Sequence, residues 1–268
     1  MRLLFNALVF VATLYVVLLV VLWSFQSRFI YPAPQTPAPV TPGYEEVQLE
    51  TSDGLSLRSF YREAADGLPT VVYFHGNGGT LAEASISNIG LTEAGFGSLM
   101  VEYRGYGGNP GDPSEQGFYR DGEAAMAWLA DQDIARDDTV IIGNSIGSGV
   151  ATEMAVRHDP AALILVAPFT SLPEAAQSNL WWMPAKMLVR DQYRSAEKIE
   201  GLDMPILIQH GDADALVPFE HGKALSEISD NAVFQPFEGS GHSLTFEPRS
   251  QVARRDWLLQ QLGMSERL

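Results

Sequence analysis

Short, almost wholly apolar runs recur along the chain after residue 69, and stretches with a helical pattern separate them. The runs cover residues 70–74, 98–102, 139–143, 162–167 and 205–210. Runs of this length, rich in Val, Ile and Leu, are typical of strands buried on both faces of a parallel sheet. The helical stretches cover residues 81–94, 114–131, 146–158, 220–228 and 251–262. This alternation predicts an α/β fold with a mostly parallel, doubly wound sheet.

We expect the first two strands to form a hairpin and the last strand to lie near an edge of the sheet. Residues 46–50 and 55–61 alternate apolar and polar side chains on either side of Asp53-Gly54, which is a hairpin pattern. Residues 232–237 are expected to form a further strand, nearer an edge. With no internal repeat and no second boundary in the sequence, residues 45–268 are predicted to form one domain, long enough for a well-buried core.

The N-terminal run differs from everything that follows it. Residues 3–25 contain no charged side chain and only one strongly polar one, Asn6. At about 1.5 Å per residue, a helix of this length crosses a hydrocarbon core of about 30 Å. A cleaved signal peptide would have a shorter run and a small-x-small cleavage site, and a buried core helix would show a polar face. We therefore predict that residues 1–28 form an uncleaved transmembrane anchor, with Trp23 and Phe25 near the interface.

A proline-rich stretch follows the anchor, and residues 29–44 are predicted to form a spacer. Prolines 32, 34, 37, 39 and 42 favour an extended polyproline-II segment. Such a spacer would hold the domain a few tens of Å from the bilayer, at about 3.1 Å per residue; a recognition site for a proline-binding partner is the alternative. The basic residues flanking the run, Arg2 and Arg28, lead us to expect an inside N-terminus and an exported domain.

Composition excludes several classes of function. Lys and Arg total 17 against 33 Asp and Glu, a formal net charge of −16, which argues against nucleic acid as a partner. The chain has no cysteine, so disulfides, thiolate catalysis and Cys-ligated metal centres are excluded. The sequence also lacks an H-E-x-x-H pattern, and His210, Asp212 and Asp214 alone do not make a convincing metal-ligand set. We therefore expect neither a metal nor a cofactor.

The chemistry-bearing motifs follow predicted strands. Gly143-Asn144-Ser145-Ile146-Gly147 comes directly after the run 139–143 and opens a helical stretch. In this context a G-x-S-x-G pattern places the serine on a sharp, exposed turn, where Ser145 can act as a nucleophile. The Ile146 amide would then point towards a developing oxyanion. The alternative is a glycine-rich strand–helix turn with an incidental serine.

Two histidine-containing glycine loops accompany this turn. His75-Gly76-Asn77-Gly78-Gly79 follows the run 70–74 and can offer a second oxyanion amide, that of Asn77. His75 itself is expected to be a structural hydrogen-bonding residue rather than a catalytic base. Gly239-Ser240-Gly241-His242-Ser243 follows the last predicted strand, and its flanking glycines suit an exposed loop that carries the base, His242.

A short acidic loop supplies the third member of a catalytic triad. Residues 210–218 follow the run 205–210 and contain two aspartates, Asp212 and Asp214. Either carboxylate could face an imidazole, but Asp212 can also bond backbone amides of the turn. Catalytic residues of open α/β sheets lie after the carboxyl ends of strands, so we expect Ser145, Asp214 and His242 to meet there.

Together these motifs resemble the α/β-hydrolase superfamily over about residues 45–265. Within it, the chain is most similar to the membrane-anchored branch of bud-emergence-type and animal α/β-hydrolase-domain proteins. Four further segments carry this resemblance: residues 103–107, 111–115, 167–171 and 210–218. It implies a nucleophile at Ser145, an acid at Asp214 and a base at His242, in the order that the superfamily uses. One departure is Asn144, where other residues such as His are frequent, and it affects only the wall of the site.

The resemblance implies ester or thioester hydrolysis through an acyl-enzyme, with lipids, acylglycerols or acylated proteins as substrates. The insertion from about residue 169 to residue 202 carries the candidate acyl-pocket residues Trp181, Trp182, Met183 and Met187. Aromatic side chains grouped in this way more often close a core. Two other functions stay open: a serine peptidase on the same fold, and a non-catalytic binding protein tethered to a membrane. The intact triad disfavours the non-catalytic binding protein. A peptidase of this fold would usually carry an extra domain that screens the active site, and 268 residues leave no room for one.

Overall fold

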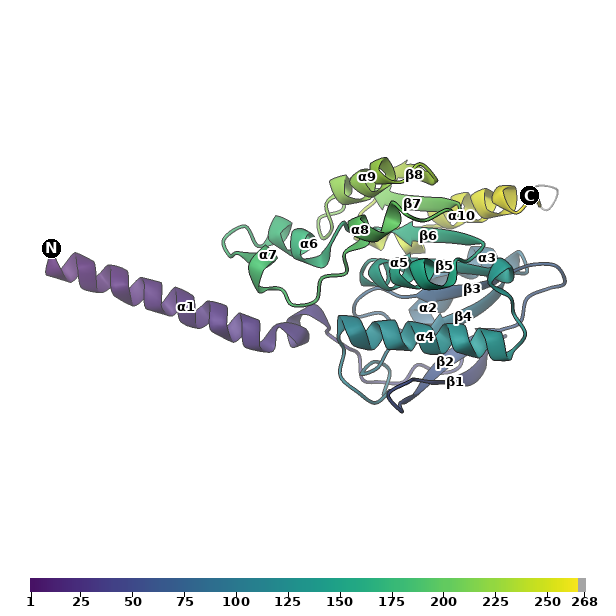
Figure 1. Ribbon diagram of the computed structural model, residues 1–268, viewed down its shortest axis with the longest axis horizontal. Helices are drawn as coiled ribbons and strands as arrows, with labels where there is room; N and C mark the ends of the chain where they lie inside the picture. Colours follow the sequence, from purple (N-terminus) through teal and green to yellow (C-terminus); the bar gives the residue numbers. More distant parts are fainter. Residues whose placement is uncertain (265–268) are drawn as a thin grey trace.

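The computed structural model describes residues 1–264 and contains one eight-stranded sheet (Figure 1). The strand order is β1-β2-β4-β3-β5-β6-β7-β8. The β1–β2 and β2–β4 pairs are antiparallel, and every other pair is parallel. The strands are β1 (Glu45–Glu50), β2 (Ser56–Arg62), β3 (Thr70–Phe74), β4 (Gly97–Val101), β5 (Thr139–Asn144), β6 (Ala162–Val166), β7 (Ile206–Gly211) and β8 (Ala232–Phe237). The predicted fold class is confirmed, including the hairpin and the edge position of residues 232–237.

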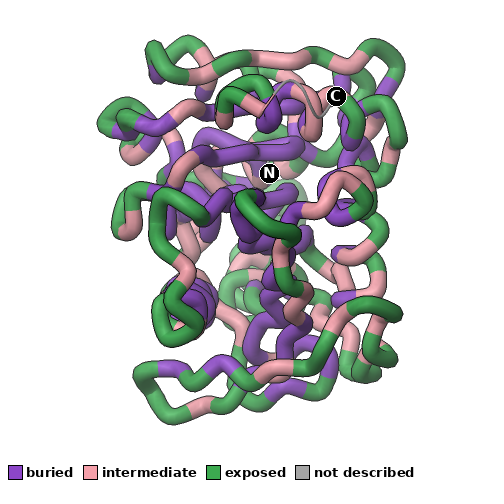
Figure 2. Tube along the Cα trace, turned by 90° about the vertical axis from the view of Figure 1, so that its right-hand side faces the viewer, coloured by how far each residue is buried: buried purple, intermediate pink, exposed green. Residues whose placement is uncertain are grey.

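Helices cover both faces of the sheet, because the central strands alternate their side chains between two apolar clusters. Val72, Ile141 and Leu163 point to the face that α4 and α5 cover, whereas Val71, Val140 and Ile164 point to the face that α2, α3 and α10 cover. Figure 2 shows these strands as buried tubes through the middle of the domain. The helices are α1 (Arg2–Ile30), α2 (Leu81–Ser87), α3 (Ile89–Glu93), α4 (Glu115–Asp131), α5 (Ile146–His158), α6 (Leu172–Asn179), α7 (Ala185–Leu188), α8 (Ser195–Ile199), α9 (Phe219–Ile228) and α10 (Pro248–Gln261), with 3₁₀ turns η1 (Arg136–Asp138) and η2 (His242–Phe246).

The predicted helix over residues 81–94 is wrong in one respect, since it is divided between α2 and α3 at Asn88. The side-chain amide of Asn88 donates to the Ala84 carbonyl at 3.1 Å. A side chain that bonds its own backbone in this way competes with the helical pattern. The insertion after β6 holds three short helices, α6, α7 and α8, which the sequence patterns did not predict.

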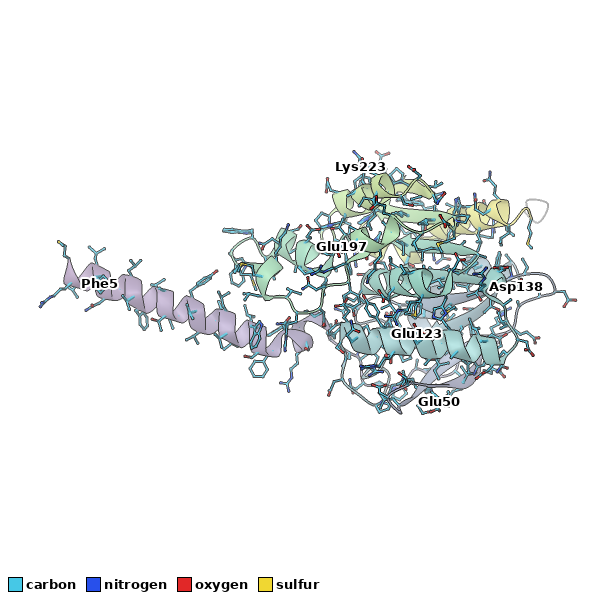
Figure 3. All side chains as sticks on the ribbon, in the orientation of Figure 1. Phe5, Glu50, Glu123, Asp138, Glu197 and Lys223 are labelled. Atoms are coloured by element: carbon cyan, nitrogen blue, oxygen red, sulfur yellow. The ribbon has the colours of Figure 1, made fainter. Side chains whose placement is uncertain are left out.

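Helix α1 extends away from the domain with its side chains exposed along most of its length, as at Phe5 near its far end (Figure 3). Its 29 residues include an 18-residue window of mean hydropathy 2.7, none of it buried. By length and composition the helix is therefore a candidate membrane span.

The proline-rich segment after α1 forms neither helix nor strand over residues 31–44, and it packs on the domain instead of holding it away. Pro34 accepts a hydrogen bond from the Gly107 amide at 2.7 Å, and Ala38 accepts one from the Arg58 guanidinium at 2.8 Å. Tyr31, only 4% exposed, packs edge-on against Phe118. The prediction that this segment holds the domain a few tens of Å from the bilayer is therefore wrong. The backbone carbonyls of Pro34 and Ala38 and the ring of Tyr31 all contact the domain.

Candidate active site

Ser145 lies on a strained turn between β5 and α5. Its backbone has φ +53° and ψ −120°, a conformation that costs a non-glycine residue on the order of 1–3 kcal/mol. The Ser145 amide donates to Val166 of β6 at 2.9 Å, which ties the turn to the neighbouring strand. The turn projects the side chain from the carboxyl end of the sheet, at the N-terminus of α5.

The two flanking glycines are required by close packing. A Cβ atom on Gly147 would lie 2.2 Å from the Phe74 carbonyl oxygen, and one on Gly143 would lie 2.4 Å from the Gly147 carbonyl oxygen. Any larger residue would therefore push α5 away from β3 and β5. This is the physical reason for the glycine spacing that the sequence shows around Ser145.

His242 and Asp214 complete a hydrogen-bonded chain with Ser145. The Nε2 atom of His242 lies 2.9 Å from the Ser145 Oγ, and its Nδ1 lies 2.8 Å from the Asp214 Oδ2. A carboxylate can only accept, so Nδ1 carries the proton and Nε2 is free to accept from the serine hydroxyl. The structure thus brings together the three side chains that the sequence singled out.

Asp214 is the more strongly held of the two aspartates in its loop. Its Oδ1 accepts from the amides of Leu216 and Val217 at 2.8 and 2.9 Å. Burial by itself would raise the pKa of Asp214, but hydrogen bonds from His210, His242 and the Val217 amide hold this pKa well below its usual range. Asp212, in contrast, is exposed and accepts from the Gly239 amide at 2.7 Å, so it has the turn-bonding role considered for it.

The glycine loop after β3 faces Ser145 across a pocket of about 200 Å³. Gly76 lies so close that a Cβ atom on it would be 3.5 Å from the Ser145 Cβ and 2.7 Å from the side-chain Nδ2 of Asn144. Asn77 and Asn144 both line this pocket, together with His242. Of the two residues predicted to supply oxyanion amides, Asn77 lines the pocket from the loop. Ile146 directly follows Ser145 as the first residue of α5 and is not among the residues that line the pocket.

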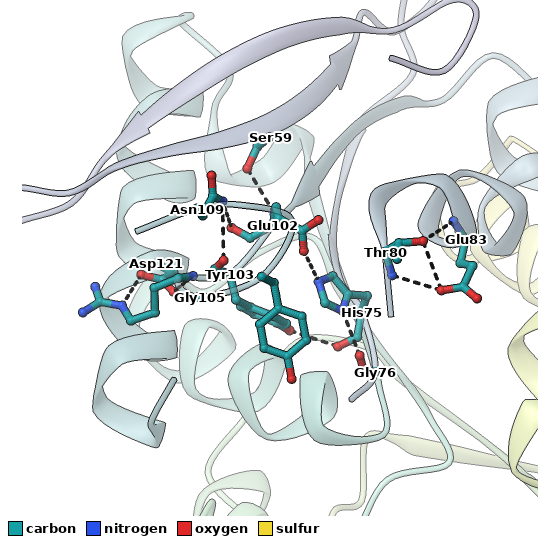
Figure 4. Close-up of polar contacts among 12 residues, drawn as sticks. Ser59, His75, Gly76, Thr80, Glu83, Glu102, Tyr103, Gly105, Asn109 and Asp121 are labelled. Carbon is teal, nitrogen blue, oxygen red and sulfur yellow. Dashed lines mark hydrogen bonds and ion pairs between the residues drawn. The ribbon is translucent and has the colours of Figure 1, made fainter. Parts of the chain in front are cut away.

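A buried pair of hydrogen-bonded side chains, His75 and Glu102, lies behind this loop (Figure 4). The Nε2 of His75 is 2.9 Å from the Glu102 carboxylate, and its Nδ1 is 2.8 Å from the Gly76 carbonyl oxygen. Both side chains are at most 3% exposed. Tyr103 donates its hydroxyl to the His75 carbonyl at 3.1 Å. His75 is thus a structural residue that fixes the loop, since both of its ring nitrogens bond groups other than Ser145.

Sequence reasoning missed two supporting side chains, Glu102 and His210. The Nε2 of His210 lies 3.0 Å from the Val217 carbonyl oxygen and 3.4 Å from the Asp214 carboxylate. Both residues sit at the carboxyl end of an apolar run, in β7 for His210 and directly after β4 for Glu102. The sequence did contain a signal for both residues, namely a polar side chain at the end of a buried apolar strand. Such a side chain needs a hydrogen-bond partner at that edge of the sheet.

The four candidate acyl-pocket residues do not line the pocket beside Ser145. Trp181 and Met187 are 83% and 85% exposed. Trp182 and Met183 instead line a separate apolar cavity against α1. Among residues 1–264, no group of three or more His, Asp or Glu side chains is placed to share a metal ion.

Comparison with known proteins agrees with this architecture. A family model of the α/β-hydrolase fold matches residues 69–196. An uncharacterised protein of Mycobacterium tuberculosis is 39% identical over 204 residues, which cover 74% of this chain and 73% of that protein. The human alpha/beta hydrolase domain-containing protein 17B is 34% identical over 190 residues, covering 69% of this chain and 64% of that protein. The chain therefore belongs to the α/β-hydrolase superfamily.

Solved structures show the same fold. The Pyrococcus furiosus esterase Pf2001 superposes with a TM-score of 0.69 at 17% identity, covering 86% of this chain and 97% of the esterase. The esterase Est1E of Butyrivibrio proteoclasticus, with ferulic acid bound, gives a TM-score of 0.67 at 19% identity, covering 81% and 99%. Family and fold together class the chain as a hydrolase.

Replacement of Asp214 by Asn is expected to lower the stability of the protein in a pH-dependent way. Because the folded-state pKa lies below the unfolded value of about 4, the carboxylate stabilises the fold above that pH, and this contribution is lost as the pH falls. Thermal unfolding of the full-length protein at about pH 7 and about pH 3 should show a smaller wild type–variant gap at the lower pH. The control, Asp212→Asn, removes an exposed carboxylate and should give a smaller gap at pH 7. A gap for Asp214→Asn that grows towards low pH would contradict this reading.

Proposed function

We propose that this protein is a membrane-tethered serine hydrolase that cleaves carboxylic ester or thioester bonds of lipids, acylglycerols or acylated proteins. The observation that carries the proposal is the unbroken hydrogen-bond chain from Ser145 through His242 to Asp214. Ser145 lies on a strained turn and lines a pocket. These are the elements that nucleophilic acyl transfer requires.

In the proposed reaction, His242 Nε2 takes the Ser145 proton while Oγ forms a bond to the substrate carbonyl carbon. The carbonyl oxygen becomes an oxyanion, which the Asn77 and Ile146 amides bind. Asp214 holds the imidazole in the required tautomer and stabilises its positive form. His242 then gives the proton to the departing alcohol or thiol, leaving an acyl-serine. Water repeats the sequence, with His242 as base, to release the acid and restore Ser145.

The low pKa of Asp214 supports this assignment of roles. A carboxylate that stays ionised well below neutral pH can compensate the charge that His242 gains in the transition state. The names of the structural neighbours, which include esterases, agree with ester cleavage. The same chemistry serves thioesters. A thiol has a lower pKa than an alcohol, so a thiolate leaves more readily than an alkoxide.

Membrane tethering rests on α1. The helix is long and apolar enough to span a bilayer, and its large side chains are exposed. Exposed apolar area of this extent is unfavourable in water and favourable in lipid. The carboxyl edge of the sheet, where Ser145 lies, is also the edge from which α1 extends, since Asn77 on the oxyanion loop donates to the Ile30 carbonyl.

Substitution of Ser145 and of Asp214 is expected to impair hydrolysis of p-nitrophenyl esters by the full-length protein in detergent micelles. Ser145→Ala should lower kcat on the order of 10⁴-fold or more, because no nucleophile remains. Asp214→Asn should lower it on the order of 10⁴-fold by favouring the wrong tautomer. The matched control, Asp212→Asn, should change kcat less than about threefold. Equal losses for the two aspartate variants would exclude Asp214 from the assigned role.

Charging α1 is expected to release the protein from membranes. Arginine at the centre of a span costs about 2.5–3.5 kcal/mol per residue, so Val16→Arg with Val20→Arg should move the chain into the soluble fraction after carbonate extraction. The control, Val156→Arg with Val233→Arg, makes the same change at similarly exposed valines on the domain and should leave the chain in the membrane pellet. If both double variants stay with the membrane, α1 is not the anchor.

A further inference from the structure

An apolar cavity of about 260 Å³ lies between the domain end of α1 and the segment that carries α6 and α7. Figure 1 shows this segment beside α1, away from the body of the domain. Leu22 and Phe29 line the cavity from α1, and Ala176, Leu180 and Met183 line it from the other side. The wall is thus shared between the candidate membrane span and the catalytic domain.

The polar groups at this junction are already paired. The Gln26 side chain donates to the carbonyls of Trp23 and Leu188 at 2.9 and 3.2 Å. Its Oε1 accepts from the Arg190 amide at 2.8 Å, and the Arg190 guanidinium lies over the Trp23 ring. These bonds hold α1 against the α6–α7 segment. They also leave the cavity with an apolar wall, which favours a hydrocarbon occupant over a polar one.

The cavity lies next to the pocket that holds Ser145. Ile30, in the cavity wall, accepts a hydrogen bond from the side chain of Asn77 in the pocket wall. On the other side, Asn179 donates to the Leu216 carbonyl at 2.7 Å. Leu216 lines the Ser145 pocket, and the residue after Asn179 lines the cavity. The walls of the two spaces are therefore in direct hydrogen-bond contact at Ile30 and Asn77, and are joined through Asn179 at a second place.

The surroundings of the cavity match the edge of a bilayer. Phe29 in its wall is 66% exposed, and the neighbouring Trp181 and Met187 are more exposed still. Trp23 and Arg190 are residue types that favour the membrane interface. With α1 across a bilayer, the mouth of the cavity would lie where acyl chains meet headgroups.

From these observations we propose that the cavity is the acyl-chain site of the enzyme, filled by a fatty acyl chain that enters from the bilayer while its carbonyl reaches Ser145. An apolar cavity of about 150 Å³ suffices for a benzene-sized ligand, and this one is larger. The inference rests on the proposed hydrolase function and names its substrate class, long-chain esters or thioesters of the membrane. Helix α1 is then part of the substrate site as well as an anchor.

Chain-length preference tests the site in the full-length protein. Ala176→Phe fills the cavity and Phe29→Ala removes part of its wall. Each should lower the ratio of kcat/KM for p-nitrophenyl palmitate over butyrate about tenfold, because apolar contacts with the long chain are lost. The matched controls are Ser178→Phe on α6 and Phe25→Ala on α1, neither of which lines the cavity, and both should keep the ratio within about twofold. An unchanged ratio in both cavity variants, with butyrate still hydrolysed, overturns the acyl-chain site and leaves the hydrolase function standing.

A binding measurement separates this inference from catalysis. In a Ser145→Ala background in liposomes, a diazirine analogue of palmitic acid should label residues 172–190 on irradiation. Ala176→Phe should reduce that labelling about fivefold or more, whereas Ser178→Phe should not. Labelling of residues 3–21, exposed to lipid in every variant, is the internal reference. Labelling of 172–190 that does not respond to Ala176→Phe refutes the site. If the Ser145→Ala protein labels as expected but the protein with Ser145 intact hydrolyses no ester, the hydrolase function is refuted instead and the acyl-chain site stands.

Discussion

The geometry of the site depends on one backbone constraint, the sharp turn at Ser145 between β5 and α5. A positive φ at a serine is unfavourable, and it is maintained here by packing on both sides. Gly147 lets α5 approach the carbonyls at the end of β3, and Gly143 lets it approach β5, so closely that a Cβ atom on either glycine would clash. The same approach brings Ser145 against Gly76 of the oxyanion loop. The strain at one residue thus places the serine, the amide after it and the facing loop in a single arrangement.

Buried polar side chains at the ends of neighbouring strands keep that arrangement rigid. Glu102 after β4 binds His75 after β3 and so holds the oxyanion loop. The Nε2 of His210 at the end of β7 lies 3.4 Å from the carboxylate of Asp214, which in turn orients His242. Glu102 and His210, which are at most 2% exposed, thus support two residues of the site from the protein interior. Because such groups are costly when unpaired in a low-dielectric interior, the two pairs favour one conformation of the site over alternatives.

The sequence was most informative where the interactions are local. The β-branched runs predicted the parallel strands closely, and the glycines around Ser145 predicted the turn, because both patterns reflect packing within a few residues. The positions of Asp214 and His242 followed from strand order, since loops after parallel strands meet at one edge. The docking of α1 was not predictable in this way. It depends on contacts such as Gln26 with Leu188 and Tyr31 with Asp191, which join residues about 160 positions apart. The short helices after β6 were missed for the same reason, because their conformation depends on packing against α1 and the domain rather than on a periodic pattern.

The central claim is that Ser145 is a nucleophile activated by the folded site. The most direct measurement is mass spectrometry of the full-length protein after exposure to a fluorophosphonate, which reacts covalently with activated serines. The account predicts one adduct, on the peptide that contains Ser145, and none once the protein has been unfolded before exposure. A folded protein that remains unmodified, or an adduct on another residue while Ser145 stays free, would contradict the account.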